Sequence, residues 1–303
     1  MITGRWGKPT EVRLDITVDP DGTVRGVVNP GRQDAVIREG RFDPATGELR
    51  LEGEHLRVDG TAIPFHIHGR LEGRALHVAF EFGATRGEDT LVRVEDWRAP
   101  RMTLRDRLQD HLADLQRWYF SRGRPTGRAN ARRLRERGES LDSITMREAV
   151  AADIPALAAL HVELWNRTYR TTRGPTVATR MWQWNQVFAA ERRRDFVLLL
   201  LEDRRGRLIG FVFGRLSDGE FDAELSKIYL RWEYHGLGLG RRMMHEVARR
   251  FAAMGARSFV LHAERSNPTI GFYDRMGGER LTDDKERFTG AYAWRDVRAI
   301  KSP

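Results

Sequence analysis

A short glycine-rich segment between an expected strand and an expected helix has residue types and spacing suited to chemistry. Residues 224–230 (ELSKIYL) read as a strand, and a helix is expected from about 239 to 254. Between them runs HGLGLG at 235–240, followed at once by Arg241 and Arg242. Glycines allow unusual dihedrals and close backbone approach, and a helix N-terminus offers unpaired N–H groups and a positive dipole end. Such a turn is suited to binding an anion, in particular a pyrophosphate.

Other interpretations of a glycine-rich turn have to be weighed against this one. A dinucleotide-binding fingerprint needs GxGxxG in an early βαβ unit and an acidic residue about 20 residues later. Here GLGLG follows several expected strands, and the residues after it read differently. A phosphate-loop NTPase needs GKS or GKT, which the sequence does not contain. A turn that serves packing alone stays open at this point.

Two ordered motifs resemble the GNAT family of N-acetyltransferases. The family's core motif is a strand end, four residues, Gln or Arg, two residues, Gly, one residue, and Gly or Ala. Here Leu230 precedes four residues and His235, with Gly238 and Gly240 at the matching spacing. The family's second motif is an Asn followed by a helix reading roughly AxxFYxKxGF, and NPTIGFYDRMGG at 267–278 matches it. The resemblance covers about residues 144–300, and the His in place of Gln or Arg is a departure from the pattern.

This resemblance implies acyl transfer from acetyl-CoA to an amine by direct attack, without a metal. The pantetheine arm would insert between two splayed strands, and the pyrophosphate would be held by N–H groups of the glycine turn. The residues expected to bind the cofactor are Ile228, Tyr229, Leu230, His235, Gly236, Leu237, Gly238, Leu239, Gly240, Arg241, Arg242, Asn267, Phe272 and Arg275.

The predicted catalytic residues are Tyr273 and Glu224. The resemblance places the phenol of Tyr273 near the cofactor sulfur, where it would protonate the departing thiolate as a general acid. Its alternative role is to pack the helix onto the sheet. Glu224 begins the strand that carries the pantetheine contacts, and a half-buried carboxylate there could have a raised pKa and act as the base. The alternatives are an exposed glutamate with no role, a water chain as the base, and Asp222 in its place.

Aromatic residues are expected to form the acceptor pocket, because aromatic walls suit an amine as an apolar or cation–π surface. Trp165 and Tyr169 lie where related sequences carry an aromatic pair. The further candidates are Trp182, Trp184, Tyr292 and Trp294. Core packing is the alternative role for all of them.

Residues 1–97 read as β-structure. Leu14, Ile16 and Val18 alternate with polar residues at the period of two of a half-buried strand, and turn signals recur at short intervals. We predict about eight antiparallel strands that close into a small lipocalin-like barrel. His66 and His68 share one face of a strand; we expect exposed histidines there rather than a metal site.

A helix is expected at 103–121, with Thr103 as its N-cap. Its apolar stripe comprises Leu104, Leu108, His111, Leu112, Leu115 and Tyr119. The basic segment GRANARRLRERGES at 127–140 has no clear apolar face. We expect a solvated linker there, with an RNA- or partner-binding arm as the alternative.

Composition limits the function classes. The 303 residues carry a net charge of +9 and no cysteine, which excludes disulfides, thiolate metal sites and a cysteine nucleophile. The excess of Arg lies C-terminal to residue 100 and suits an anionic ligand or a solvated surface. No apolar run is long enough to span a membrane, and no signal-peptide pattern opens the sequence, so we expect a cytoplasmic protein.

The sequence therefore predicts an α+β protein of two domains. Residues 1–97 are a small antiparallel β-barrel, 98–143 a helix and basic linker, and 144–303 a mixed α/β acetyltransferase domain of the GNAT type. The predicted function is transfer of an acetyl group from acetyl-CoA to a primary amine of a small molecule or peptide. The alternative is a non-catalytic protein that binds CoA, or a small apolar ligand in the barrel. We expect no metal, no membrane partner and no nucleic acid; an oligomer stays open.

Overall fold

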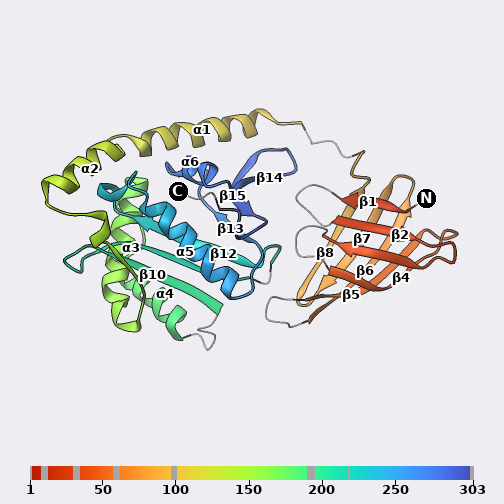
Figure 1. Cartoon of the computed structure of the whole chain (residues 1–303). Coiled ribbons are helices and arrows are strands. Elements are labelled where there is room, and N and C mark those ends of the chain that lie inside the picture. The colour runs from red at the N-terminus through yellow and green to blue at the C-terminus, as the bar shows by residue number, and fades with distance from the viewer. Residues whose placement is uncertain are drawn as a thin grey trace. The chain divides into compact units, whose positions relative to one another are not determined.

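The computed structural model describes residues 2–7, 13–29, 35–56, 62–96, 101–189, 195–217 and 219–300. The chain forms two compact units (Figure 1). One comprises Met1–Met102, Asp218–Asp222 and Leu281–Phe288, and the other comprises Thr103–Ser217, Ala223–Arg280 and Thr289–Pro303. The predicted boundary at residue 97 lies outside the described residues. Residues 103–143, predicted as a separate segment, belong to the same compact unit as the acetyltransferase-like region.

The first unit contains the predicted antiparallel meander. Within the described part of residues 2–96 it has eight strands: β1 (Gly4–Gly7), β2 (Arg13–Val18), β3 (Val24–Val28), β4 (Ala35–Phe42), β5 (Glu48–Leu56), β6 (Ala62–Glu72), β7 (Ala75–Phe82) and β8 (Thr85–Val92). They lie in chain order, each antiparallel to the next. An isolated antiparallel bridge between Trp6 and Arg93 brings β1 beside β8. The sheet is therefore nearly closed, which confirms the barrel-like architecture.

Alternation along the strands fills the barrel interior with apolar side chains. Phe65 and Ile67 of β6 are fully buried, whereas His66 and His68 between and after them are exposed. Trp6 is buried beside the closing bridge and donates its indole N–H to the Ile2 carbonyl at 2.7 Å. Trp6, Phe65 and Ile67 belong to one continuous hydrophobic core. Among the described residues, no three His, Asp or Glu side chains gather so that they could hold a metal ion.

The second unit is built on a mixed sheet with the strand order β14-β15-β13-β12-β11-β10-β9. Its strands are β9 (Thr145–Glu148), β10 (Phe196–Glu202), β11 (Leu208–Leu216), β12 (Ala223–Leu230), β13 (Phe259–His262), β14 (Glu279–Thr282) and β15 (Phe288–Trp294). Its later helices are α3 (Ile154–Tyr169), α4 (Val177–Ala189), α5 (Leu239–Ala253) and α6 (Ile270–Arg275). Strands β12 and β13 pair in parallel only through Ala223–Phe259 and Glu224–Val260. Beyond Glu224 the two strands part.

Helices cover both faces of this sheet (Figure 1). Helices α3 and α4 pack on Leu198, Leu200 and Phe211. Helix α5 covers the opposite face, where Phe251 lies so close to Gly214 that a Cβ there would overlap its ring. None of the helices in the described residues is both long and apolar enough to cross a membrane.

Helices α1 (Leu104–Ser121) and α2 (Gly127–Glu136) precede this sheet; we call residues 103–139 the arm. Thr103 caps α1 as predicted, in a capping box with Asp106. The predicted apolar stripe is not the face that packs: Leu104, Leu108, Leu112 and Leu115 are 50–74% exposed. The packed face carries Ala113, which is buried, together with Arg117 and Asp110, which bind Arg265. Periodicity identified an amphipathic helix but not its partner.

The basic segment expected as a solvated linker is mostly helix α2. Thr126 caps it by accepting a hydrogen bond from the Ala129 amide at 3.2 Å. Asn130 and Leu134 are buried, at 0% and 4% exposure, although the surrounding arginines face solvent. Two buried residues in ten were too few to give an apolar face in the sequence.

The alternation in β6 gives a prediction on stability. Phe65→Ala should lower the free energy of unfolding of the first unit by about 3–5 kcal/mol, because Phe65 is fully buried and stacks on Phe82 at 5.0 Å between ring centroids. His66→Ala, the matched control on the outer face, should change it by less than about 0.5 kcal/mol. Urea unfolding measures both, and equal effects would contradict this assignment of inner and outer faces.

Candidate functional site

A cavity of about 1140 Å³ opens where β12 and β13 part. Its walls come from residues 225–230 of β12, the glycine turn, the start of α5, the segment 261–269, helix α6, helix α3 and the arm. Past Glu224, no residue of β13 is paired with β12, so the main chain of Ile228, Tyr229 and Leu230 faces this opening on one side. An extended ligand can therefore add to β12 along this edge.

The glycine turn leaves open space in front of α5. Gly238 is the N-cap of α5 with φ of 82°, a region that favours glycine, and no side chain caps the helix. A Cβ at Gly238 would meet no atom within 4 Å. The uncapped N–H groups and the free space fit a phosphate group.

The predicted cofactor residues divide into two groups. Most of them line the cavity: Ile228, Tyr229, Leu230, His235, Gly236, Gly238, Gly240, Arg241, Asn267, Phe272 and Arg275. Leu237, Leu239 and Arg242 do not belong to this lining among the described residues. Leu239 is buried in the core, and the Arg242 guanidinium donates to the Ile144 carbonyl at 3.1 Å.

His235 is engaged by protein groups on both ring nitrogens. Nε2 lies 2.8 Å from the Leu230 carbonyl oxygen, and Nδ1 lies 2.6 Å from a guanidinium nitrogen of Arg124. Because a guanidinium only donates, Nδ1 accepts and Nε2 carries the proton. Burial and the charge of Arg124 lower the pKa of His235 to about 4. The imidazole is thus neutral at physiological pH and braces the turn.

Tyr273 lines the cavity and is 5% exposed. Burial raises the pKa of its phenol well above the ordinary value of 10. The phenol therefore keeps its proton across the physiological range. Its ring packs on Tyr292, 5.4 Å away between centroids.

Neither predicted base is among the described residues that line the cavity. Glu224 lies at the last pair between β12 and β13, before the strands part, and its carboxylate is 3.3 Å from Arg215. Asp222 is buried but also outside the lining. Their placement gives the role of base no support.

The cavity contains a carboxylate that the sequence reading missed. Glu264 lies two residues beyond β13 and lines the cavity. Burial is the main cause of the raised pKa of Tyr169 and of Tyr229, and the charge of Glu264 raises both further. Only the position of Glu264 in the sequence could have identified it. Glu264 follows β13, the strand that parts from β12, and therefore lies at the gap between these two strands.

Of the aromatic residues predicted to form the acceptor pocket, some line the cavity and others do not. Trp165 and Tyr169 line the cavity with ring centroids 5.1 Å apart. Trp182 is 64% exposed, and Trp184 is buried in the core against Phe211 and Phe213.

Tyr292 and Trp294 brace α6 instead of lining the cavity. The Tyr292 hydroxyl donates to Asp274 at 2.9 Å, and the Trp294 indole donates to the Met276 carbonyl at 3.1 Å. Neither belongs to the described lining. The prediction of a pocket wall for Trp182, Trp184, Tyr292 and Trp294 is therefore not met by their positions.

Two cations lie together on the α3–α4 side of β12. Lys227 lines the cavity, and its ammonium is 5.2 Å from the Phe213 ring and 5.7 Å from the Trp184 ring. Arg180 is 9% exposed, and its Nε has no hydrogen-bond partner in the described structure. Burial lowers the pKa of both groups, and the charge of Arg180 lowers that of Lys227 further. No carboxylate of the described residues forms an ion pair with either.

Comparisons with known proteins find similar sequences for the C-terminal region. The sequence model of the acetyltransferase (GNAT) family matches residues 158–278. An uncharacterized N-acetyltransferase, YuaI, of Bacillus subtilis is 27% identical over 169 residues, which is 52% of this chain and 97% of that protein. The L-methionine sulfoximine/L-methionine sulfone acetyltransferase of Pseudomonas paraeruginosa is 26% identical over 148 residues, 45% of this chain and 81% of that protein. The crystal structure of the PaiA N-acetyltransferase of Thermoplasma acidophilum with coenzyme A has a TM-score of 0.42 and 20% identity, covering 50% of this chain and 98% of that one.

The environment of His235 predicts a pH dependence. Its folded-state pKa of about 4 lies below the ordinary 6.5, so the unfolded chain binds the proton more tightly. The stability this group contributes is therefore fully present above pH 6.5 and is lost as the pH falls towards 4, by roughly 2 kcal/mol between pH 7 and 5. His235→Gln keeps an acceptor for Arg124 and a donor for Leu230 but cannot titrate.

Urea unfolding of the second unit at pH 7 and pH 5 measures the difference. Wild type should lose more stability than His235→Gln by that amount. Equal losses would show that His235 does not carry this dependence.

Proposed function

We propose that the C-terminal region of this chain, where the acetyltransferase (GNAT) family model matches residues 158–278, is an acyltransferase that transfers an acetyl group from acetyl-CoA to a primary amine. The observation that carries the proposal is the opening between β12 and β13, which leads to the uncapped N-terminus of α5. A cytoplasmic location belongs to this proposal, because acetyl-CoA is an intracellular metabolite.

In this proposal, the chain's own groups hold the two ends of the cofactor. The main chain of Ile228 to Leu230 binds the pantetheine amides along the open edge of β12, and the N–H groups after Gly238 bind the pyrophosphate. Asn267 and Arg275, which line the same cavity, add polar contacts. When bound, acetyl-CoA supplies a thioester whose acetyl group an amine can accept.

Tyr273 and Glu264 are the groups we propose to handle protons. The Tyr273 phenol stays protonated and donates a hydrogen bond from Oη to the leaving sulfur. Full transfer of its proton is uphill, because the raised pKa of the phenol lies above a thiol value near 8.5. Glu264 takes the place predicted for Glu224 and receives the amine proton, directly or through water.

We also propose that the acceptor amine carries an anionic group. Arg180 is buried and Lys227 half-buried, and neither forms an ion pair with a described carboxylate, although the charge of Glu224 partly offsets the effect of Arg180 on Lys227; a bound anion would offset their remaining repulsion and desolvation. The Pseudomonas relative is named for two amino acids, whose α-carboxylate lies beside the amine. L-Methionine sulfone is therefore a fitting first acceptor to test.

The acceptor proposal predicts an effect of charge removal at Lys227. Wild type should acetylate L-methionine sulfone with a higher kcat/KM than its carboxamide, and Lys227→Met should reduce this preference by about 10- to 100-fold, because a charge-assisted contact is lost. Arg215→Met is the matched control: it removes an exposed cation of the neighbouring strand. A preference unchanged in Lys227→Met would exclude this anion site.

A Tyr273→Phe variant tests the catalytic role. It should lower the single-turnover rate by about 10², because the hydrogen bond that stabilises charge on the leaving sulfur is lost, and leave CoA affinity unchanged because the ring still packs. Thioester cleavage with a panel of amines is the assay. A wild-type rate in the variant would return Tyr273 to a packing role. CoA binding without cleavage for any amine in wild type would favour the non-catalytic alternative.

A further inference from the structure

We propose that Arg124 of the arm is a phosphate-binding residue of the cofactor site. The site would then be completed by a segment that precedes the residues matched by the family model. This inference rests on the proposed function, since the ligand is the phosphate part of CoA.

Arg124 joins the two segments that border the anion-binding turn. One guanidinium nitrogen donates to Nδ1 of His235 at 2.6 Å, and the other donates to the Pro268 carbonyl at 3.2 Å. The guanidinium carbon also lies 5.3 Å from the centroid of the Trp232 ring. His235 directly precedes the glycine turn, and Pro268 follows Asn267. The cation thus lies between both motifs, and its residue lines the cavity.

The charge of Arg124 has no counter-ion among the described residues. Its protein partners, an imidazole nitrogen, a carbonyl and a ring, are all neutral. Two exposed arginines of the arm differ in this respect: Arg132 pairs with Glu136 and Arg137 with Glu139, at 3.4 and 3.3 Å. Burial lowers the pKa of Arg124 to about 10, so it stays charged at physiological pH. A partly buried, unneutralised cation beside a helix N-terminus favours an oxyanion ligand, and its remaining N–H groups can bind phosphate.

The arm is fixed where it carries this residue. The Asn130 side chain, 0% exposed, donates to the carbonyls of Trp232 and His235 at 2.7 and 2.9 Å. The backbones of Gly127 and Gly236 approach so closely that a Cβ at Gly127 would lie 2.6 Å from the Gly236 oxygen. Arg124 is therefore placed before the ligand arrives, which reduces the entropy lost on binding.

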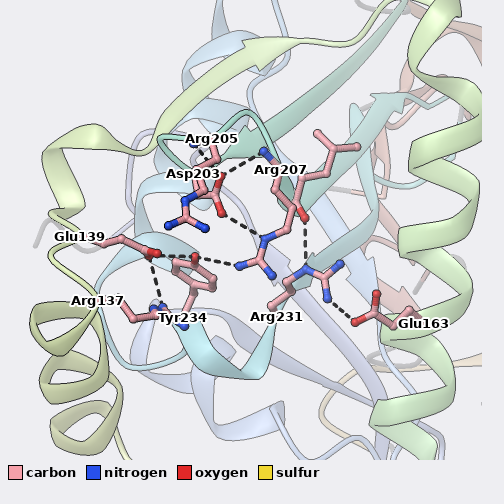
Figure 2. Close-up of polar contacts among 9 residues, drawn as sticks. Arg137, Glu139, Glu163, Asp203, Arg205, Arg207, Arg231 and Tyr234 are labelled. Atoms are coloured by element: carbon pink, nitrogen blue, oxygen red, sulfur yellow. Dashed lines mark hydrogen bonds and ion pairs between the residues drawn. The ribbon is translucent and has the colours of Figure 1, made fainter.

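The end of the arm is held as well. Figure 2 shows the Tyr234 hydroxyl between Glu139 and Arg207, each 3.4 Å away, with Arg137 beside the tyrosine. Tyr234 belongs to the short 3₁₀ helix Trp232–Tyr234 that leads into the glycine turn. Contacts of the residues that follow Arg124 thus attach the arm to this turn at two places.

Calorimetry on the full chain with CoA, dephospho-CoA and pantetheine tests the proposal. Arg124→Gln should raise the Kd for CoA about 10- to 100-fold and leave the Kd for pantetheine unchanged, because pantetheine has no phosphate. If the contact is to the pyrophosphate, the same factor appears with dephospho-CoA. If the contact is to the 3′-phosphate, the Kd for dephospho-CoA stays unchanged, because dephospho-CoA lacks that group.

Arg128→Gln is the matched control, since Arg128 is exposed on the same arm and its loss changes the net charge equally. It should change the Kd for CoA by less than about twofold. An Arg124→Gln protein that binds CoA as wild type does would overturn the inference while the proposed function stands. Equal losses for CoA and pantetheine would overturn it too, because they would indicate a displaced arm. No CoA binding by wild type would reject the proposed function itself.

Discussion

The turn from β12 into α5 depends on one buried amide. Asn130 donates to the carbonyls of Trp232 and His235, which lie beyond the end of β12, and the Trp232 carbonyl also accepts from the His235 backbone amide at 3.1 Å. Without Asn130 the His235 carbonyl would lose its described donor, and a buried carbonyl without a donor costs about 1–3 kcal/mol. The donor comes from more than a hundred residues earlier in the chain. The conformation of the glycine turn is therefore a tertiary property as well as a local one.

This arrangement explains why a histidine can stand where the family usually has Gln or Arg. The residue must donate to the Leu230 carbonyl and accept from Arg124 at the same time. A neutral imidazole does both, and a glutamine amide could do so too, but a second arginine has no acceptor to offer. The arm thus restricts which family residue can occupy this position. In return, His235 orients a cation towards the cavity without neutralising its charge.

Features that depend on local chain geometry were predictable from the sequence. Period-two alternation located the inner face of the barrel at Leu14 and Ile16, which are both buried, and the glycine spacing located the uncapped helix at Gly238. Features that depend on a partner distant in the sequence could not be predicted. The predicted apolar stripe of α1 is largely exposed, and the buried positions of the helix are Asp106 and Ala113. Helix α2 was hidden because its buried residues are one polar Asn130 and one Leu134 among arginines.

The same distinction applies to the site. Tyr273 and Asn267 could be placed at the cavity because a motif carries them on one helix and its preceding loop. Glu264 and Arg124 could not, since each is a single charged residue whose role arises only where strands part or segments meet. It follows that the compact unit that contains the cavity begins at Thr103 and not at residue 144. A chain that began at 144 would lack Arg124, Asn130 and Glu139. It would leave the His235 carbonyl at the start of the glycine turn without its described donor, even though every motif residue was still present.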